Sequence, residues 1–204
     1  MIRGTRILLG EEARIYSKTI DSMKSILRDN NYQEIIIPSI IEQEIFVNKA
    51  GPEILNQMYT FKDKGDRDIC LIPEVTAIIQ SIYNESWKKS APKPVRVFYV
   101  QRCYRYERPQ KGRYREFTQL GVEHLGGKSP QDKEEVIDLL KLCLAGFEYE
   151  FKESVKRGLN YYIEDGFEVE IPSLGAQKQV AGGGRYNEGI GWAIGIDRLL
   201  ISNE

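Results

Sequence analysis

Residues 103–127, CYRYERPQKGRYREFTQLGVEHLGG, contain parts of two strand-like segments and the arginine-rich loop that joins them. The segments extend over 94–107 and 114–125 and are rich in aromatic and β-branched side chains, which favour strands. Pro109 and Gly112 lie between them and are typical of a loop. The stretch therefore predicts two neighbouring strands of a mainly antiparallel sheet, connected through the loop at 108–113.

The same stretch concentrates positive charge in a chain whose net charge is only −1. Five basic residues lie within 103–117, against two glutamates: Arg105, Arg108, Lys111, Arg113 and Arg115. Residues two apart in a strand share a face, so Arg105 lies with Glu107, and Phe117 lies with Gln119 and Glu123. Unpaired charges are too costly to bury. This face is therefore either a solvated surface with paired charges or a cleft for a ligand with phosphates, a flat ring and a polar group.

The composition is that of a soluble globular protein, with 41% hydrophobic and 29% charged residues among 204. We expect a single domain over residues 1–204. No apolar run is long enough to span a membrane, and the charged N-terminus lacks the apolar core of a signal peptide. Cys70, Cys103 and Cys143 are odd in number and widely spaced, which favours a reducing, cytoplasmic location over a disulfide framework.

The only histidine is His124. One histidine and three scattered cysteines do not make a zinc cluster, so no metal site is expected. A Ser-His-Asp or Cys-His mechanism would have to use His124, which lies in a strand-like run, and a histidine without a catalytic role is the favoured interpretation. Carboxylates and arginines are therefore the reactive groups that remain.

The remaining elements predict an α+β fold in which helices flank an antiparallel sheet. Ser129 followed by Pro130 is typical of a helix start. Hydrophobic periodicity and turn residues place helices at 11–30, 75–87, 129–152 and 197–203, and strands at 34–38, 58–62, 68–72, 166–171, 178–186 and 191–196.

Four other segments contribute groups of the same kind and favour the cleft over the solvated surface. Glu74 lies between a strand and a helix start, and Arg157 precedes a glycine and two tyrosines. The glycine run at 181–186 could bring backbone close to a ligand. Arg198 lies where the last helix begins.

Together these segments resemble the catalytic core of a class II aminoacyl-tRNA synthetase, specifically a histidyl-tRNA synthetase. RGTRILLGEEAR resembles the opening segment of that family, and YQEIIIPSI with Pro38 resembles the class II dimer-interface motif. YRYERPQKGRYREF and AIGIDRLL resemble the second and third class motifs, while RGLNYY and AGGGRY resemble segments peculiar to the histidine enzyme. The resemblance covers nearly the whole chain in order, and it implies a class II synthetase-like antiparallel sheet flanked by helices.

The resemblance implies an ATP site. Arg105 would hold the α-phosphate, and Arg113 and Arg198 would hold the β- and γ-phosphates. Glu107 would meet the adenine amino group, and Phe117 would stack on the ring. Magnesium would accompany ATP, bound mainly by phosphates and water.

The resemblance also implies a histidine pocket beside the ATP site. Arg157 would be a catalytic arginine together with Arg105. Val75 replaces the usual glycine of the family and is expected to add bulk near this pocket. The histidine-binding residues would be Glu74, Thr76, Gln119, Glu123, Tyr161 and Tyr162, with Glu123 and Tyr162 pairing with the imidazole nitrogens.

The implied reaction is attack of the histidine carboxylate on the α-phosphorus of ATP, giving histidyl-adenylate and pyrophosphate, with transfer to tRNA(His) as a further step. The implied partners are a second copy of the chain, through the Pro38 segment, and weakly the tRNA acceptor end, through loop 107–115. Only one helix is expected where the family carries a tRNA-clamping insertion, and the 204 residues contain no segment that resembles the anticodon-binding domain of the family. Two alternatives remain. The chain could be a non-catalytic paralogue with a regulatory, histidine-sensing or tRNA-sensing role, or a fragment of a longer enzyme.

Overall fold

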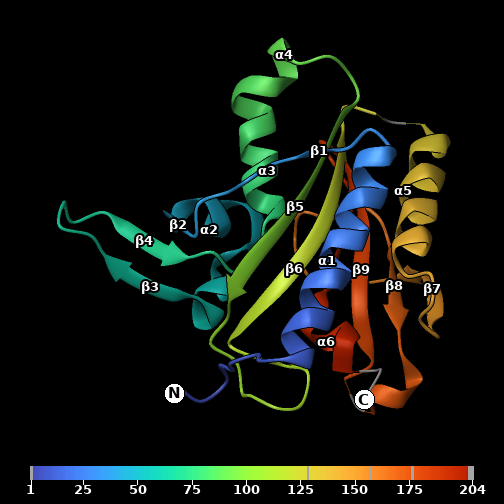
Figure 1. Ribbon diagram of the computed structural model, residues 1–204. Helices are drawn as coiled ribbons and strands as arrows, with labels where there is room; N and C mark the ends of the chain where they lie inside the picture. Colours follow the sequence, from blue (N-terminus) through green and yellow to red (C-terminus); the bar gives the residue numbers. More distant parts are fainter. Residues whose placement is uncertain (1, 128, 157, 176, 202–204) are drawn as a thin grey trace.

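The computed structural model describes residues 2–127, 129–156, 158–175 and 177–201, and its centre is a seven-stranded sheet (Figure 1). The strand order is β1-β5-β6-β10-β9-β8-β7, and every neighbouring pair is antiparallel except β1 with β5. The strands are β1 Gln33–Glu34, β5 Val95–Tyr104, β6 Glu116–Leu125, β10 Gly189–Gly195, β9 Gln179–Tyr186, β8 Gly166–Glu170 and β7 Glu150–Val155. This arrangement confirms the expected α+β fold class.

The two long strands β5 and β6 are the antiparallel pair that the sequence predicts. Their register runs from Val95 opposite Leu125 to Tyr104 opposite Glu116. β10 pairs with the other edge of β6, which places β6 inside the sheet. The predicted strand extends to residue 107, but β5 ends at Tyr104. Arg105 and Glu107 therefore lie in the following loop and not in the strand.

Three helices cover one face of the sheet: α1 Glu11–Asp29, α5 Pro130–Cys143 and α6 Ile196–Ile201. Figure 1 shows α1 and α5 side by side across the strands. Successive side chains of a strand point to opposite faces of the sheet, and Leu120, Val122 and Trp192 point into the core beneath these helices. The Trp192 indole N–H also donates a 2.7 Å hydrogen bond to the Val136 carbonyl of α5, which satisfies its one polar atom.

The opposite face is covered by α3 Thr76–Ile82, which continues through a π-helical turn, Tyr83–Trp87, and α4 Lys88–Ser90. A three-stranded sheet of β2 Ile40–Glu42, β4 Asp68–Leu71 and β3 Tyr59–Lys62 extends away from it (Figure 1). Helix α2 Glu44–Ala50 and the 3-10 turns Pro52–Gln57 and Pro172–Leu174 complete the described elements. The hairpin predicted at 58–62 and 68–72 is therefore confirmed as β3 and β4.

Two other predicted elements differ more widely from the structure. The segment 34–38 is not a buried strand, because β1 ends at Glu34 and Ile36 is 90% exposed. The helix predicted over 129–152 ends at Cys143, and the chain turns at Gly146, whose φ is +95°. Residues 150–155 instead form the edge strand β7, because Phe151 packs on Phe167 of the neighbouring strand with ring centres 5.7 Å apart.

The last helix begins one residue earlier than predicted, at Ile196, and residues 202–203 of that prediction lie outside the described residues. The three cysteines are buried free thiols. In the described part of the chain, no helix combines the length and apolarity needed to cross a membrane.

Candidate active site

Two adjoining cavities open on the sheet face opposite α1 and α5. The first cavity, of about 270 Å³, lies between the loop after β5 and the start of α6, and the second, of about 530 Å³, lies between the sheet and α3. Arg105, Gln119 and Ala193 line both cavities. The two spaces therefore form one bipartite site with Arg105 and Gln119 at the junction.

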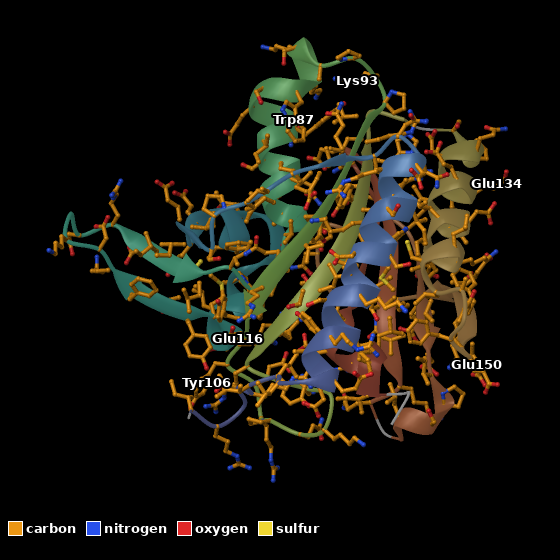
Figure 2. All side chains as sticks on the ribbon, in the orientation of Figure 1. Trp87, Lys93, Tyr106, Glu116, Glu134 and Glu150 are labelled. Carbon is orange, nitrogen blue, oxygen red and sulfur yellow. The ribbon has the colours of Figure 1, made fainter. Side chains whose placement is uncertain are left out.

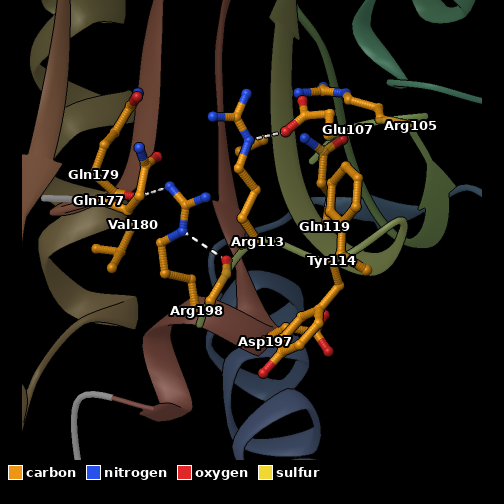
Figure 3. A pocket seen from close by; sticks show the side chains of 14 residues that line it. Arg105, Glu107, Arg113, Tyr114, Gln119, Gln177, Gln179, Val180, Asp197 and Arg198 are labelled. Atoms are coloured by element: carbon orange, nitrogen blue, oxygen red, sulfur yellow. Dashed lines mark hydrogen bonds and ion pairs between the residues drawn. The ribbon is translucent and has the colours of Figure 1, made fainter. Parts of the chain in front are cut away.

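Three arginines line the first cavity: Arg105 and Arg113 from the loop after β5, and Arg198 from α6 (Figure 3). Arg198 is fixed by two hydrogen bonds, from Nε to the Gly112 carbonyl at 2.9 Å and from Nη1 to the Gln179 carbonyl at 2.7 Å. Burial, and then the positive charges of Arg113 and Arg105, lower the pKa of Arg198. An anion in this cavity would relieve that repulsion, so the cavity suits a polyphosphate.

The two other arginines of the first cavity also have partners. Arg105 donates from Nε to the Pro73 carbonyl at 2.9 Å, and its guanidinium carbon lies 5.2 Å from the centre of the Phe117 ring. Arg113 forms an ion pair with Glu107, which also lines the cavity (Figure 3). The five residues predicted to bind ATP therefore lie together around one cavity, although Arg105 and Glu107 reach it from a loop.

Five of the six residues predicted to bind histidine line the second cavity: Glu74, Thr76, Gln119, Tyr161 and Tyr162. Glu74 is 4% exposed, and its carboxylate accepts from the Ala77 N–H at 3.0 Å and from the Tyr161 hydroxyl at 3.3 Å. Burial raises the pKa of Glu74. A cationic group in the cavity would compensate the charge of this carboxylate.

The sixth residue, Glu123, lies behind the wall of the second cavity and is fully buried. Its carboxylate accepts a 2.6 Å hydrogen bond from the Thr76 hydroxyl and a second from the Tyr186 hydroxyl. Burial raises the pKa of Glu123 to about 8. Gly191 makes room for this group, because a Cβ at that position would lie 1.9 Å from the carboxylate.

Sequence reasoning missed Tyr99 and Tyr186 as parts of this site. Tyr99 lines the second cavity, and Tyr186 donates to Glu123. Tyr99 lies opposite Gly121 in the β5–β6 register, and a Cβ on Gly121 would lie 2.2 Å from the Tyr99 hydroxyl. An aromatic residue facing a glycine across the predicted strand pair is the signal that could have found Tyr99.

Two further expectations concern the second cavity. Val75 does not add bulk to it, because this side chain is fully buried in the core with α3 and is not part of the cavity lining. Arg157 lies outside the described residues, so the structure does not place it. The residues that follow it, Gly158 to Asn160, line the second cavity.

Comparison with known proteins identifies relatives of this architecture. Residues 4–152 match the family model described as Histidyl-tRNA synthetase. A histidine--tRNA ligase of Methanosarcina acetivorans is 36% identical over 202 residues, an alignment that covers 87% of this chain and 48% of that protein. The chain thus spans about half the length of this curated relative.

A histidine--tRNA ligase of Methanospirillum hungatei is 28% identical over 304 aligned residues, covering 98% of this chain and 74% of that protein. The alignment is longer than the 204-residue chain, so the relative carries residues within the aligned region that have no counterpart here. The solved structure of apo histidyl-tRNA synthetase from S. aureus aligns with a TM-score of 0.81 at 26% identity, over 99% of this chain and 69% of that one.

Proposed function

Because the chain belongs to the histidyl-tRNA synthetase family, we propose that its two adjoining cavities bind ATP and histidine and join them as histidyl-adenylate. The histidine carboxylate attacks the α-phosphorus, the bond to the bridging oxygen breaks, and pyrophosphate leaves. The observation that carries this proposal is the shared lining: Arg105 and Gln119 belong to both cavities, where the two reacting groups would have to meet.

In the first cavity, Arg105 would hold the α-phosphate, while Arg113 and Arg198 would hold the β- and γ-phosphates. Arg113 would then exchange its ion pair with Glu107 for a phosphate oxygen, which frees Glu107 to accept from the adenine amino group. Phe117 would stack on the adenine ring. Arginine suits these roles because its planar guanidinium donates two parallel hydrogen bonds and stays charged.

In the second cavity, Glu74 and Thr76 would receive the α-ammonium group of histidine, and Gln119 would contact its carboxylate at the junction. Tyr162 and Glu123 would form hydrogen bonds with the imidazole nitrogens. Glu123 now accepts hydrogen bonds from the Thr76 and Tyr186 hydroxyls, and an imidazole N–H would replace one of these two donors. Tyr161 supports Glu74 through its hydroxyl. A pocket whose polar groups are satisfied by one ring rejects rings that lack the partner atoms.

No general base is needed, because the attacking carboxylate is already ionised. Catalysis would then rest on positioning and on positive charge around the α-phosphate, where Arg157 would join Arg105. Within the described ranges no cluster of three or more His, Cys, Asp or Glu side chains suits a metal. The carboxylates of the first cavity, Glu107 and Asp197, are paired with arginines, so magnesium would be held mainly by phosphates and water.

The proposal has three further parts. Histidine would be transferred to tRNA(His), and loop 107–115 would contact the acceptor end of the tRNA. The chain would assemble as a homodimer through the segment around Pro38. Contact through a few basic side chains would be weak and would decrease steeply with salt. The segment around Pro38 carries Ile36 and Ile40, which are 90% and 56% exposed. A second copy of the chain would cover these apolar side chains.

Histidine-dependent exchange of labelled pyrophosphate into ATP tests the proposed reaction. We expect exchange with histidine and not with other amino acids, and binding of a non-hydrolysable ATP analogue measured by calorimetry. Exchange should be lost in Arg157→Ala and retained in a matched control, Arg67→Ala, which removes an exposed ion pair with Asp63 in the β3–β4 turn. Histidine binding without exchange would instead support the regulatory alternative.

A further inference from the structure

The N-terminal segment before α1 packs against the arginine-rich loop of the first cavity. The Arg115 N–H donates a 2.7 Å hydrogen bond to the Gly4 carbonyl. Gly4 has a φ of +91°, and a Cβ there would lie 2.9 Å from the side chains of Arg115 and Pro109. The segment is therefore packed closely against both ends of the loop, and Figure 1 shows the chain entering at this end of the sheet. Tyr106 and Glu116, which flank the loop, lie at the same end (Figure 2).

Arg6 connects this segment to two residues that line the first cavity. Its Nη2 donates to Asp197 Oδ1 at 2.6 Å, and its guanidinium carbon lies 4.6 Å from the centre of the Tyr114 ring. The other carboxylate oxygen of Asp197 accepts the Thr118 N–H of β6 at 2.5 Å. One side chain thus joins the N-terminus, the loop and the start of α6, which lie far apart in sequence.

The position of Asp197 makes this contact electrostatically important. Asp197 directly precedes Arg198, and its carboxylate lies in the wall of a cavity whose other charged groups include three arginines. A carboxylate without Arg6 would oppose the positive charge that the cavity offers to phosphates. It would also be able to draw Arg198 away from the two carbonyls that now fix its direction.

We propose that Arg6 is a positioning residue for the triphosphate: it neutralises Asp197 and holds Tyr114, and so keeps Arg198 and the loop at 108–113 in place. Arg6 is absent from the lining of the first cavity and acts through Asp197 and Tyr114. The inference rests on the proposed function, because it assigns a role in binding the phosphates of ATP. It concerns a residue outside the three class motifs and the two histidine-specific segments.

Steady-state exchange kinetics of Arg6→Ala and Arg6→Lys test the proposal. We expect Arg6→Ala to raise the KM for ATP about tenfold, as loss of a charged hydrogen bond does, while the KM for histidine stays within about twofold. Arg6→Lys keeps the charge opposite Asp197 but not the planar contact with Tyr114, so it should recover part of the ATP affinity. The control is Arg14→Ala, which removes an exposed ion pair with Glu11 near the same end of the chain.

Limited digestion with trypsin gives a second readout that does not depend on activity. Arg6→Ala should be cleaved faster than wild type after Lys111, which is exposed in the loop and is followed by Gly112, while Arg14→Ala should not. Equal changes in both KM values, or unchanged cleavage in the loop, would overturn the proposal. If wild type shows no exchange, the proposed function fails, and the cleavage pattern still decides whether Arg6 fixes the loop.

Discussion

The Thr76 hydroxyl lies 2.6 Å from a carboxylate oxygen of Glu123, at the boundary between the second cavity and the core. Thr76 lines the cavity and Glu123 does not. The hydrogen bond therefore connects the surface that a ligand would touch to a fully buried carboxyl group. Ionisation of Glu123 is therefore coupled both to folding and to the cavity surface.

The first prediction concerns the pH dependence of stability. Burial raises the pKa of Glu123 to about 8, against an ordinary value of 4.5. The folded state keeps a proton on Glu123 that the unfolded state releases across this window, so the contribution of Glu123 to the free energy of unfolding falls as pH rises from about 4.5 to about 8. Glu123→Gln cannot ionise, so its stability relative to wild type should increase by roughly 2 to 4 kcal/mol between the two ends of this window.

Urea unfolding at a series of pH values measures this difference. The control is Glu134→Gln, which removes a carboxylate from the outer face of α5 (Figure 2) and should follow the wild-type profile. A constant difference between Glu123→Gln and wild type across the window would contradict the burial of an ionisable Glu123.

The second prediction concerns the junction of the two cavities. Arg105→Ala should reduce the rate of ATP–pyrophosphate exchange by about 10² to 10³-fold, as loss of one preorganised donor to a transition state does. Arg105→Lys should recover little, because an ammonium group does not reproduce the planar two-donor geometry. The measurement is kcat and KM for both substrates, and a change confined to one KM would argue against a role at the junction.

The third prediction concerns the space for Tyr99. Gly121→Ala would place a Cβ 2.2 Å from the Tyr99 hydroxyl and 2.9 Å from the Trp192 carbonyl, so we expect a loss of about 1 to 3 kcal/mol in the free energy of unfolding. Adding Tyr99→Leu should recover part of this loss by removing the ring. Gly158→Ala is the control, because an added Cβ there would meet no heavy atom within 4 Å beyond the adjacent residues of the chain. Equal stability of the two alanine variants would show that Tyr99 does not occupy this position.

The fourth prediction concerns self-association. Ile36→Glu should dissociate a homodimer at micromolar concentration, because it replaces an exposed apolar side chain, which a second copy would cover, with a charged one. Ile163→Glu, which changes an isoleucine with 55% exposure in another region, should leave the association unchanged. Sedimentation velocity measures both variants, and wild-type protein that stays monomeric would contradict the dimer.

The sequence predicts the centre of the fold better than its edges. The β5–β6 pair is long and rich in aromatic and β-branched residues, and turn residues lie between its strands, so local pattern and final structure agree. The helix predicted over 129–152 failed because Phe147 and Phe151 continue its apolar spacing, and only pairing with β8 shows that Phe151 belongs to a strand. The strand predicted over 34–38 failed because an apolar run in the sequence does not show whether its side chains are buried, and Ile36 is exposed.

The candidate site shows the same limit. Arg105, Glu107 and Phe117 could be expected in one cleft from their types and spacing, and they line the first cavity. Arg113 lines it too, but only the resemblance to the family predicted its role there. The role of Arg6 could not be predicted, because its partners Tyr114 and Asp197 lie 108 and 191 residues further along the chain. Only the packing of the N-terminal segment against the loop brings these groups together.

The most direct test of the central claim is a crystal structure with a non-hydrolysable analogue of histidyl-adenylate. The account predicts the adenosine in the first cavity, the imidazole in the second, and the group that replaces the phosphate next to Arg105 and Gln119. Electron density for the analogue outside these cavities, or with its linking group away from Arg105, would contradict it.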